Sequence, residues 1–425
     1  MDALAGFLPL IKLFAVFAAM LAGIRFRLGL WPSILGGGLL LGLIFGMAPR
    51  AWLSTAVVAL TTEKTILLAV VVGLILVLSD ILELSGQNRR LMDALSGYLT
   101  SPRLRLAFFP SLIGLLPMPG GAIFSAPMLG SVAERMGIRP EDKVLLNYWF
   151  RHMWELIFPL YPGIILASSL AGVPLITLIG YTLPGMVFFT FLGWWFLLRP
   201  SRLPLAAEAA GEGGFRDARQ AVRHSLPLIA AILGSLGLEA LLSAVRPEWS
   251  YEWGIIAGLI AAIFLALAMN RLGARFLLGV LMQRKLLGML LVIASIIVFK
   301  DVMAGAGVVE DLSRSAGGSM ALFSAVMLLP FLVGMVSGIT MAFVGATLPL
   351  LLGLLQQAGA MDSLAPYLVL NLFSGFLGVM VSPLHVCYVL TCQYFEVDLA
   401  AAWSRLLAPC ALLLVFALAY FAVLA

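Results

Sequence analysis

Ionisable side chains stand within the apolar run 142–170. Asn147, Arg151 and Glu155 recur every four residues, which would place them on one face of a helix. Measured from Asp142, Arg151 lies roughly 14 Å along such a helix, near the middle of a membrane-crossing segment. Charged groups at that depth are costly and usually functional. The spacing predicts a site for a substrate or a proton, and an internal Arg151–Glu155 ion pair that fixes helix packing is the alternative.

A second polar signal interrupts the centre of the apolar stretch 105–136. Residues 117–121 read Pro-Met-Pro-Gly-Gly, which ends one helix and lets another begin at about residue 122. The free backbone amides of the second helix would then face a ligand, and a helix N-terminus at membrane depth favours an anion. We therefore predict that this tip binds substrate through Pro119, Gly120 and Gly121. A purely structural turn is the alternative.

The apolar stretch 319–357 is interrupted in a similar way, by Ser-Gly-Ile-Thr at 337–340. Two hydroxyl groups lie at this tip, and the carbonyl groups of the turn could coordinate Na⁺. We predict substrate contacts at Ser337, Gly338 and Thr340, and we treat Ser337 and Thr340 as candidate Na⁺ ligands. Hydrogen bonds from the hydroxyl groups to the helix backbone are the alternative.

Each of the long apolar segments that follow these two stretches also carries a break. Pro159 and Pro162 are expected to interrupt the first segment, and Ser-Pro-Leu-His at 382–385 the second. His385 is a candidate proton site or polar ligand contact, with a packing histidine as an equal alternative. His152 is included in the predicted binding set and lies in the same polar segment, 147–155, as Arg151 and Glu155.

Length and composition decide which elements hold these residues. The chain has 425 residues, of which 62% are hydrophobic and 11% charged, and its mean hydropathy is +1.08. A soluble protein could not bury so much apolar surface, and the charges separate apolar runs of about 17–25 residues, the length that crosses a bilayer. We predict an all-α polytopic membrane protein with ten spans near 5–23, 31–48, 65–84, 142–170, 173–198, 225–245, 252–270, 285–303, 364–395 and 401–424.

The interrupted stretches 105–136 and 319–357 are expected to be re-entrant hairpins. Each arm of the first has about 12 to 15 residues and reaches roughly 18–22 Å, too short for a hydrocarbon core of ~30 Å. Lys and Arg are unevenly divided by the ten-span arrangement, with nineteen of 26 on one side and five on the other. Because cytoplasmic loops are the richer in basic residues, both termini are predicted to lie outside.

The chain repeats itself at an offset of 218 to 224 residues. Leu-Pro-Leu-Ile at 8–11 recurs at 226–229, and the surroundings of Asn147 recur around Asn371, which therefore joins the predicted site. Five crossings in each half would insert the second half upside down, so the repeats are inverted and the hairpin tips meet near the midplane. The charges of the segment 147–155 have no equivalent in the second half, so the shared architecture does not require them.

Sequence motifs for catalysis are absent. The three histidines cannot form H-E-x-x-H, and neither G-x-S-x-G nor G-x-x-x-x-G-K-[ST] occurs. Cys387, Cys392 and Cys410 form no metal-ligand spacing and are expected to be small core residues. We predict no enzymatic activity and no cofactor beyond a coupling ion, Na⁺ or H⁺. The net charge of +5 requires no nucleic-acid partner, because basic residues flanking membrane spans explain it.

Three motifs also carry a family resemblance: Leu-Pro-Met-Pro-Gly-Gly-Ala at 116–122, Ser-Ala-Pro-Met at 125–128, and Asn-Tyr-Trp-Phe-Arg-His-x-Trp-Glu at 147–155. They resemble an uncharacterised prokaryotic membrane-protein family of the ion transporter superfamily, over nearly the whole chain. Relatives of that family include sodium-dicarboxylate and citrate symporters, gluconate permeases and the large membrane subunit of TRAP carriers. The resemblance implies two inverted repeats, each with a re-entrant hairpin and a broken helix, a homodimer and an elevator-type movement.

Together these features predict a secondary active transporter. It would move a small organic anion, a carboxylate, across the prokaryotic cytoplasmic membrane, coupled to Na⁺ or H⁺ by elevator-type alternating access. The expected partners are the anionic substrate, the lipid bilayer and a second copy of the chain. A passive ion or solute channel, or a non-transport membrane scaffold, is the alternative. The predicted parts are a first repeat 1–198 (scaffold 1–86, transport part 105–198), a cytoplasmic linker 199–224, and a second repeat 225–425 (scaffold 225–304, transport part 319–424).

Overall fold

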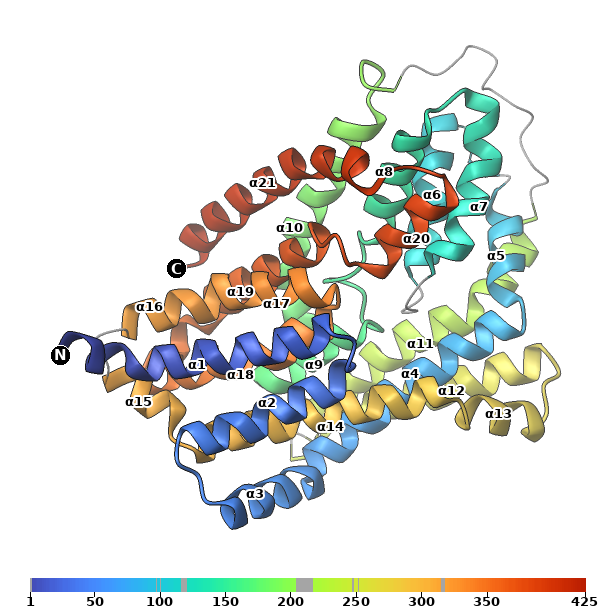
Figure 1. The fold of residues 1–425 in the computed structure, drawn as a ribbon. Coiled ribbons are helices and arrows are strands. Elements are labelled where there is room, and N and C mark those ends of the chain that lie inside the picture. Colours follow the sequence, from blue (N-terminus) through green and yellow to red (C-terminus); the bar gives the residue numbers. More distant parts are fainter. Residues whose placement is uncertain are drawn as a thin grey trace.

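The computed structural model describes residues 2–96, 98–99, 101–115, 121–203, 217–246, 248–250, 252–314 and 318–425. Every regular element in these residues is a helix, and long helices lie side by side (Figure 1). The first half holds α1 (Asp2–Arg25), α2 (Leu30–Ile44), α3 (Pro49–Thr61), α4 (Glu63–Leu84), α5 (Gln87–Ser96), α6 (Pro102–Gly114), α7 (Ala122–Ala133), α8 (Pro140–Arg151), α9 (Pro162–Ala171) and α10 (Leu175–Gly193). The second half holds α11 (Ala218–Val245), α12 (Glu252–Met269), α13 (Ala274–Leu281), α14 (Arg284–Gly305), α15 (Val308–Arg314), α16 (Gly318–Phe323), α17 (Leu329–Ser337), α18 (Thr340–Gln357), α19 (Leu364–Met380), α20 (Val386–Tyr394) and α21 (Leu399–Leu424).

Ten helices in the described part of the chain are long and apolar enough to cross a membrane, so this is a multi-pass membrane protein. Their number equals the prediction, but the set differs. The span expected at 31–48 is the 15-residue α2, which ends early because Gly46 turns the backbone at a φ of +80°. The segments 142–170 and 364–395 each form two shorter helices. The second of these keeps one candidate span at 361–380, so the expected spans 31–48 and 142–170 are the two that are lost, and the arms 320–337 and 340–357 are long enough to span in their place.

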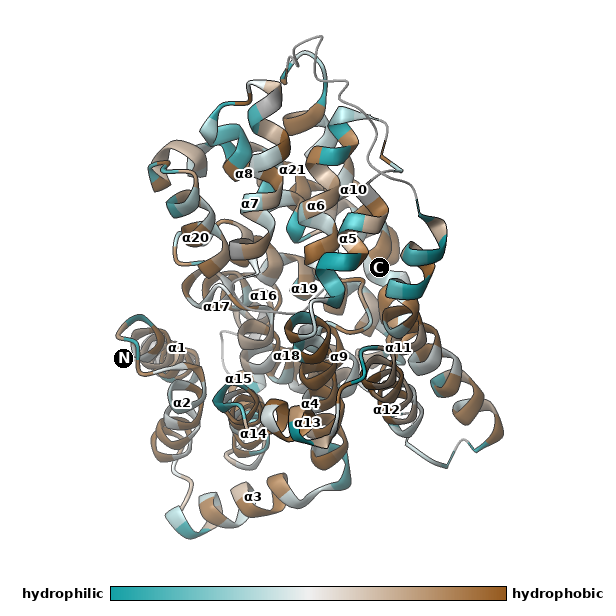
Figure 2. Cartoon of the chain, turned by 90° about the vertical axis from the view of Figure 1, so that its right-hand side faces the viewer, coloured by the Kyte–Doolittle hydropathy of each residue, from teal (hydrophilic) through white to brown (hydrophobic). Residues whose placement is uncertain are grey.

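The helices pack in two groups. In one group α14 contacts α2 and α4, and α12 contacts α4 and α11; in the other α17 packs on α19, α6 on α8, and α21 on α19 and α10. α18 joins the groups because it contacts α14 in the first and both α17 and α19 in the second. Figure 2 colours most of each long helix brown, with hydrophilic teal residues prominent on α5. Apolar surface on the long helices thus serves both the core and the surrounding membrane.

Both predicted helix breaks are present. Residues 152–161 separate α8 from α9, and residues 381–385 separate α19 from α20. The first break begins well before its prolines, because the chain leaves the α-helix in successive turns in which the Glu155 N–H donates to the His152 carbonyl at 3.2 Å. Glu155 therefore lies in the break, and the prediction that it shares one helix face with Arg151 is wrong.

Aromatic side chains bind the carbonyl groups at the interrupted helix ends. The Tyr148 hydroxyl donates to two carbonyl groups in the last turn of α19, at 3.1 Å each. Trp154 and Tyr161 donate to two carbonyl groups in the last turn of α6, at 2.9 and 2.5 Å. An unpaired backbone group inside a bilayer costs several kcal/mol, so these donors allow helices to end within the protein.

The two interrupted stretches form helical hairpins of different length. The arms of the first, α6 and α7, have 13 and 12 residues, as expected for a re-entrant hairpin, and its tip at 116–120 lies outside the described residues. The second hairpin has arms of 18 residues each, which by length alone could cross. Its turn depends on Gly338, whose φ of +63° is a left-handed conformation that favours glycine.

Candidate functional site

Arg151 ends α8 and lies where three elements meet. Its side chain is buried, and the guanidinium lies against Gly121 at the start of α7, because a Cβ at Gly121 would stand 2.2 Å from Arg151 Nη2. Arg151 Nη1 also donates to Cys387 Sγ at 3.1 Å, and Cys387 belongs to α20. The end of α8, the first hairpin and α20 therefore share one guanidinium group.

His152 and His385 bring the two helix breaks into contact. Their Nε2 atoms lie 3.1 Å apart, and His152 Nδ1 donates to the Tyr148 carbonyl at 2.6 Å. Both rings are buried, with 2% and 5% of their surface exposed. The second hairpin tip also reaches this point, because a Cβ at Gly338 would lie 2.9 Å from the His385 Cα.

Glu155 completes the buried cluster from within the first break. Its carboxylate accepts a hydrogen bond from the Thr340 hydroxyl, at the first residue of α18, and its Oε2 lies 4.0 Å from His152 Nε2. Thr340 in turn packs its methyl group against Gly163 at the start of α9. Since Glu155 is 7% exposed, a negative charge there must be balanced by neighbouring protein groups or by a bound cation.

The two predicted asparagines occupy equivalent but separate places. Asn147 Nδ2 donates to the Thr391 hydroxyl at 3.0 Å, which joins α8 to α20. Asn371 Nδ2 donates to the Ala325 carbonyl at 2.8 Å, which joins α19 to the first arm of the second hairpin. Both side chains are fully buried, and neither amide oxygen has a hydrogen-bond partner within the described residues.

One short segment of the first half thus makes polar contacts to the second half along its whole length. Its five contacting residues are Asn147, Tyr148, Arg151, His152 and Glu155. Their partners come from three elements of the second half, namely α18, the end of α19 and the region from the second break into α20. The site is therefore built between the halves and belongs to neither alone.

Comparison with known proteins adds one finding. Residues 10–424 match a family described as protein of unknown function (DUF401). The chain belongs to the DUF401 family. No curated protein matches this DUF401 chain. Membership of the ion transporter superfamily stays a prediction.

The predicted binding residues of the DUF401 chain fall into three sets. The cluster just described brings together Gly121, Arg151, His152, Glu155, Gly338, Thr340 and His385. Asn147 and Asn371 pack beside it through α20 and the second hairpin, while the Ser337 hydroxyl accepts from Ile339 N–H at 3.3 Å within its own turn. Pro119 and Gly120 lie outside the described residues.

Sequence reasoning missed Cys387 and Thr391, which α20 adds to the site. Cys387 is buried, as expected of a core cysteine, but its sulfur and one nitrogen each from His152 and His385 all lie within 4.8 Å of one another. No local spacing could reveal this set, because the two halves of the cluster are more than 230 residues apart. The available signal was the position of Cys387 two residues after a predicted helix break.

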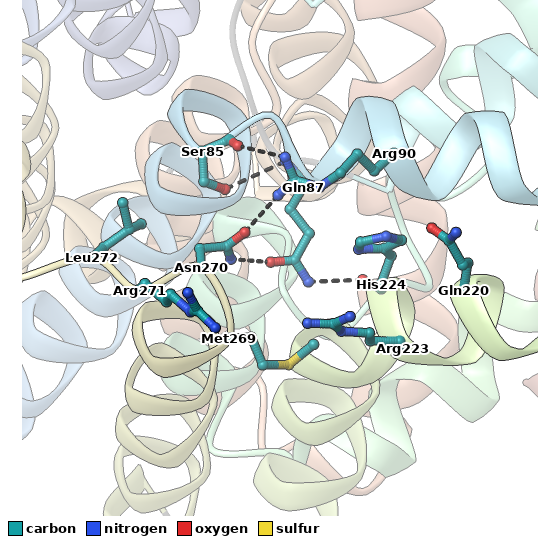
Figure 3. Close-up of a pocket in the computed structure, with 10 residues that line it drawn as sticks. All are labelled: Ser85, Gln87, Arg90, Gln220, Arg223, His224, Met269, Asn270, Arg271 and Leu272. Atoms are coloured by element: carbon teal, nitrogen blue, oxygen red, sulfur yellow. Dashed lines mark hydrogen bonds between the residues drawn. The ribbon is translucent and has the colours of Figure 1, made fainter.

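A polar cavity of about 410 Å³ lies away from the cluster, between the α4–α5 turn, α11 and the end of α12 (Figure 3). Gln87 and Asn270 form its centre: Asn270 Nδ2 donates to Gln87 Oε1, and Arg90 donates to Asn270 Oδ1, both at 2.5 Å. Arg223 and Arg271 also line the cavity. Sequence analysis did not single out this cavity, whose lining residues come from helices far apart in the chain.

Proposed function

We propose that the DUF401 chain is a secondary active transporter for a small organic anion, coupled to Na⁺ or H⁺, and that it is a carrier and not an enzyme. One observation carries the proposal: both helix breaks and both hairpins meet at a single buried cluster of ionisable side chains. Interrupted helices at membrane depth are tolerated where they line a binding site, and transporters place substrate sites at such points.

Helix order supports an internal duplication. Five helices, α1–α5, precede the first hairpin, and five, α11–α15, precede the second; a hairpin, a broken helix and a long final helix follow in both halves. Equivalent glycines also make equivalent contacts. A Cβ at Gly114 would lie 2.2 Å from the Arg151 carbonyl oxygen, and a Cβ at Gly334 would lie 2.3 Å from that of Gly375. These paired contacts are what two copies of one ancestral unit would retain.

The arrangement of the short helices supports inversion of the two halves. The equivalent helices α3 and α13 lie toward opposite sides of Figure 1, as do α5 and α15, whereas both chain termini lie toward the same side. We place the side with α5 and α13 in the cytoplasm because of its arginines, such as Arg89, Arg90 and Arg275, and both termini outside. In line with the family resemblance of the sequence, we propose that the membrane is the prokaryotic cytoplasmic membrane.

Side-chain chemistry favours an anion. Arg151 keeps its charge when buried and presents a planar fork suited to a carboxylate, and the adjacent start of α7 adds a helix N-terminus. Glu155 offers an oxygen ligand for a coupling ion or a site for a coupling proton, together with the Thr340 hydroxyl. An anion and a cation loaded together would leave the buried cluster close to neutral.

The proposed movement carries α6–α10 and α16–α21 as a transport part against a scaffold of α1–α4 and α11–α14. In a homodimer the scaffolds would form the fixed interface. Large movements of this kind are expected where two groups of helices meet along few connecting elements, and α9 and α18 make such connections here.

Solute counterflow tests the proposal. Organic acids that stabilise the purified protein against heat, with and without Na⁺, are first selected, and proteoliposomes loaded with each acid are then exposed to the same acid in labelled form. A carrier gives saturable exchange that requires internal solute. Conductance that rises without saturation would instead identify a channel, and absence of flux for every stabilising acid would favour a scaffold role. Arg246→Ala, which removes an arginine whose side chain is 63% exposed, should exchange solute like the wild type and is the matched control for substitutions of Arg151.

A further inference from the structure

We propose that His152, His385 and Cys387 form a binding site for a transition-metal dication of the zinc type. The inference goes beyond anion transport and stands whether or not the chain carries an anion. It rests on three side chains whose ligand atoms, two imidazole nitrogens and one sulfur, lie within 4.8 Å of one another in the buried cluster. These are the ligand types that zinc sites use most.

The separation of the two imidazoles fits a shared metal ion. A tetrahedral zinc ion with Zn–N bonds of about 2.0–2.1 Å holds two ligand nitrogens about 3.3 Å apart. The Nε2 atoms of His152 and His385 lie 3.1 Å apart, so a movement of a few tenths of an ångström would bring the two nitrogens to that separation, and the Cys387 sulfur, within 4.8 Å of them, would move closer to complete the site. Without a metal, His385 Nε2 donates its proton to His152 Nε2; a metal ion would replace that proton and use the lone pairs of both nitrogens.

The tautomer of His152 is already fixed for metal binding. A carbonyl oxygen can only accept, so His152 Nδ1 must carry the proton that it donates to Tyr148 at 2.6 Å. The lone pair of neutral His152 is therefore on Nε2, the atom that faces His385. Metal-binding histidines commonly hold their second nitrogen in this way, because the carbonyl group orients the ring and increases its basicity.

Arg151 adjusts the sulfur ligand and the net charge. The proposed site would use Cys387 as a thiolate ligand, and Arg151 Nη1 already donates to that sulfur at 3.1 Å. The thiolate then lies between the guanidinium and the metal and separates two positive groups. With Glu155 ionised, the loaded cluster keeps one net positive charge, which suits a bound anion. Imidazole and thiolate ligands select zinc, cobalt, nickel or copper over Mg²⁺, Ca²⁺ and Na⁺.

Within the described residues only these three side chains form the ligand cluster, so a fourth coordination position would be open in the proposed site. Glu155 is the nearest further ligand, but its Oε2 is 4.0 Å from His152 Nε2, and its other oxygen already accepts from Thr340. Three protein ligands and one open position are typical of zinc sites that act on a bound molecule, whereas structural zinc sites have four protein ligands. An open position beside Arg151 could receive a carboxylate oxygen.

Cobalt(II) titration of the purified full-length protein in detergent tests the site. After removal of metals with a chelator, the wild type should bind about one Co²⁺ per chain and show both the visible bands of tetrahedral cobalt and a near-ultraviolet sulfur-to-metal charge-transfer band. Zn²⁺ should displace the cobalt. The Cys387→Ser variant should lose the charge-transfer band and bind Zn²⁺ more than about 100-fold more weakly in competition with a chromophoric chelator.

The chain supplies its own controls. Cys392 and Cys410 are also buried, and neither belongs to the three-ligand cluster, so Cys392→Ser and Cys410→Ser should keep the band and the zinc affinity. A variant with His385→Gln should also lose binding while remaining monodisperse in size-exclusion chromatography. Metal-free wild type that gives no cobalt bands, or a charge-transfer band that persists in Cys387→Ser, would overturn the proposal. Counterflow plays no part in this test, so a failure of the transport proposal leaves its result unchanged.

Discussion

Gly114→Ala should destabilise the protein because the added methyl group has no room. The new Cβ would lie 2.2 Å from the carbonyl oxygen of Arg151, whereas carbon and carbonyl oxygen normally approach to about 3.3 Å. α6 must therefore move about 1 Å from α8 or bend. Forced overpacking costs about 1–3 kcal/mol, and the better helix propensity of alanine returns up to about 1 kcal/mol. The expected loss of unfolding free energy is about 1–2 kcal/mol.

Thermal unfolding in detergent, followed by tryptophan fluorescence, measures this loss as a fall of roughly 2–4 °C in Tm. Gly180→Ala is the control, since Gly180 is also helical and a Cβ there meets nothing within 4 Å. That variant should be as stable as the wild type or slightly more stable. Gly334→Ala should lose as much as Gly114→Ala, because its Cβ meets a carbonyl oxygen at 2.3 Å. If Gly114→Ala proved as stable as Gly180→Ala, the close helix contact would not exist.

Three further predictions follow from the site and the scaffold. Arg151→Ala should abolish counterflow while the protein still purifies as a monodisperse species. Arg151→Lys should restore little flux, because an ammonium group lacks the planar fork of a guanidinium. Normal flux in either variant would show that Arg151 is not part of the site. Cysteines introduced at Gly120 and Ile339, after replacement of the native cysteines, should react with small thiol reagents from opposite membrane sides, and reaction of both from one side would refute the inverted repeats. Asp80→Asn should lower the unfolding free energy by about 1–3 kcal/mol, because buried Asp80 accepts from Lys285 at 2.8 Å; no change in urea or thermal unfolding would show that this pair contributes nothing.

Much of the fold could be predicted because membrane helices obey a length rule. Apolar runs of sufficient length correctly indicated an all-helical, multi-pass protein, and the proline-containing segment 382–385 correctly marked the break before α20. The short α2 was not predictable from apolar length, since its end depends on the left-handed conformation of Gly46. The second hairpin was expected to be re-entrant like the first, but its arms have 18 residues each, and α18 continues through Pro349 without a break.

The site was harder to predict than the fold because its contacts join distant residues. The polar segment 147–155 was visible in the sequence, but periodicity placed Glu155 on a helix that ends at Arg151. A tertiary contact is present at the end of that helix, because Gly114 packs directly on the Arg151 carbonyl. Cys387 was interpreted as a core residue on spacing alone. Its second role arises only when the breaks of the two halves are brought side by side.

The contacts between the halves also restrict which parts can move independently. Separating residues 147–155 from their partners would break polar contacts at five residues in a buried setting, each worth about 1 kcal/mol or more. Tyr148 alone holds the end of α19 through its hydroxyl and His152 through its carbonyl. The two breaks cannot move relative to each other without losing these contacts, so they must translate or rotate together as one rigid body. Any large conformational change of the protein must therefore bend the backbone outside this body, in the segments that connect it to the rest of the chain.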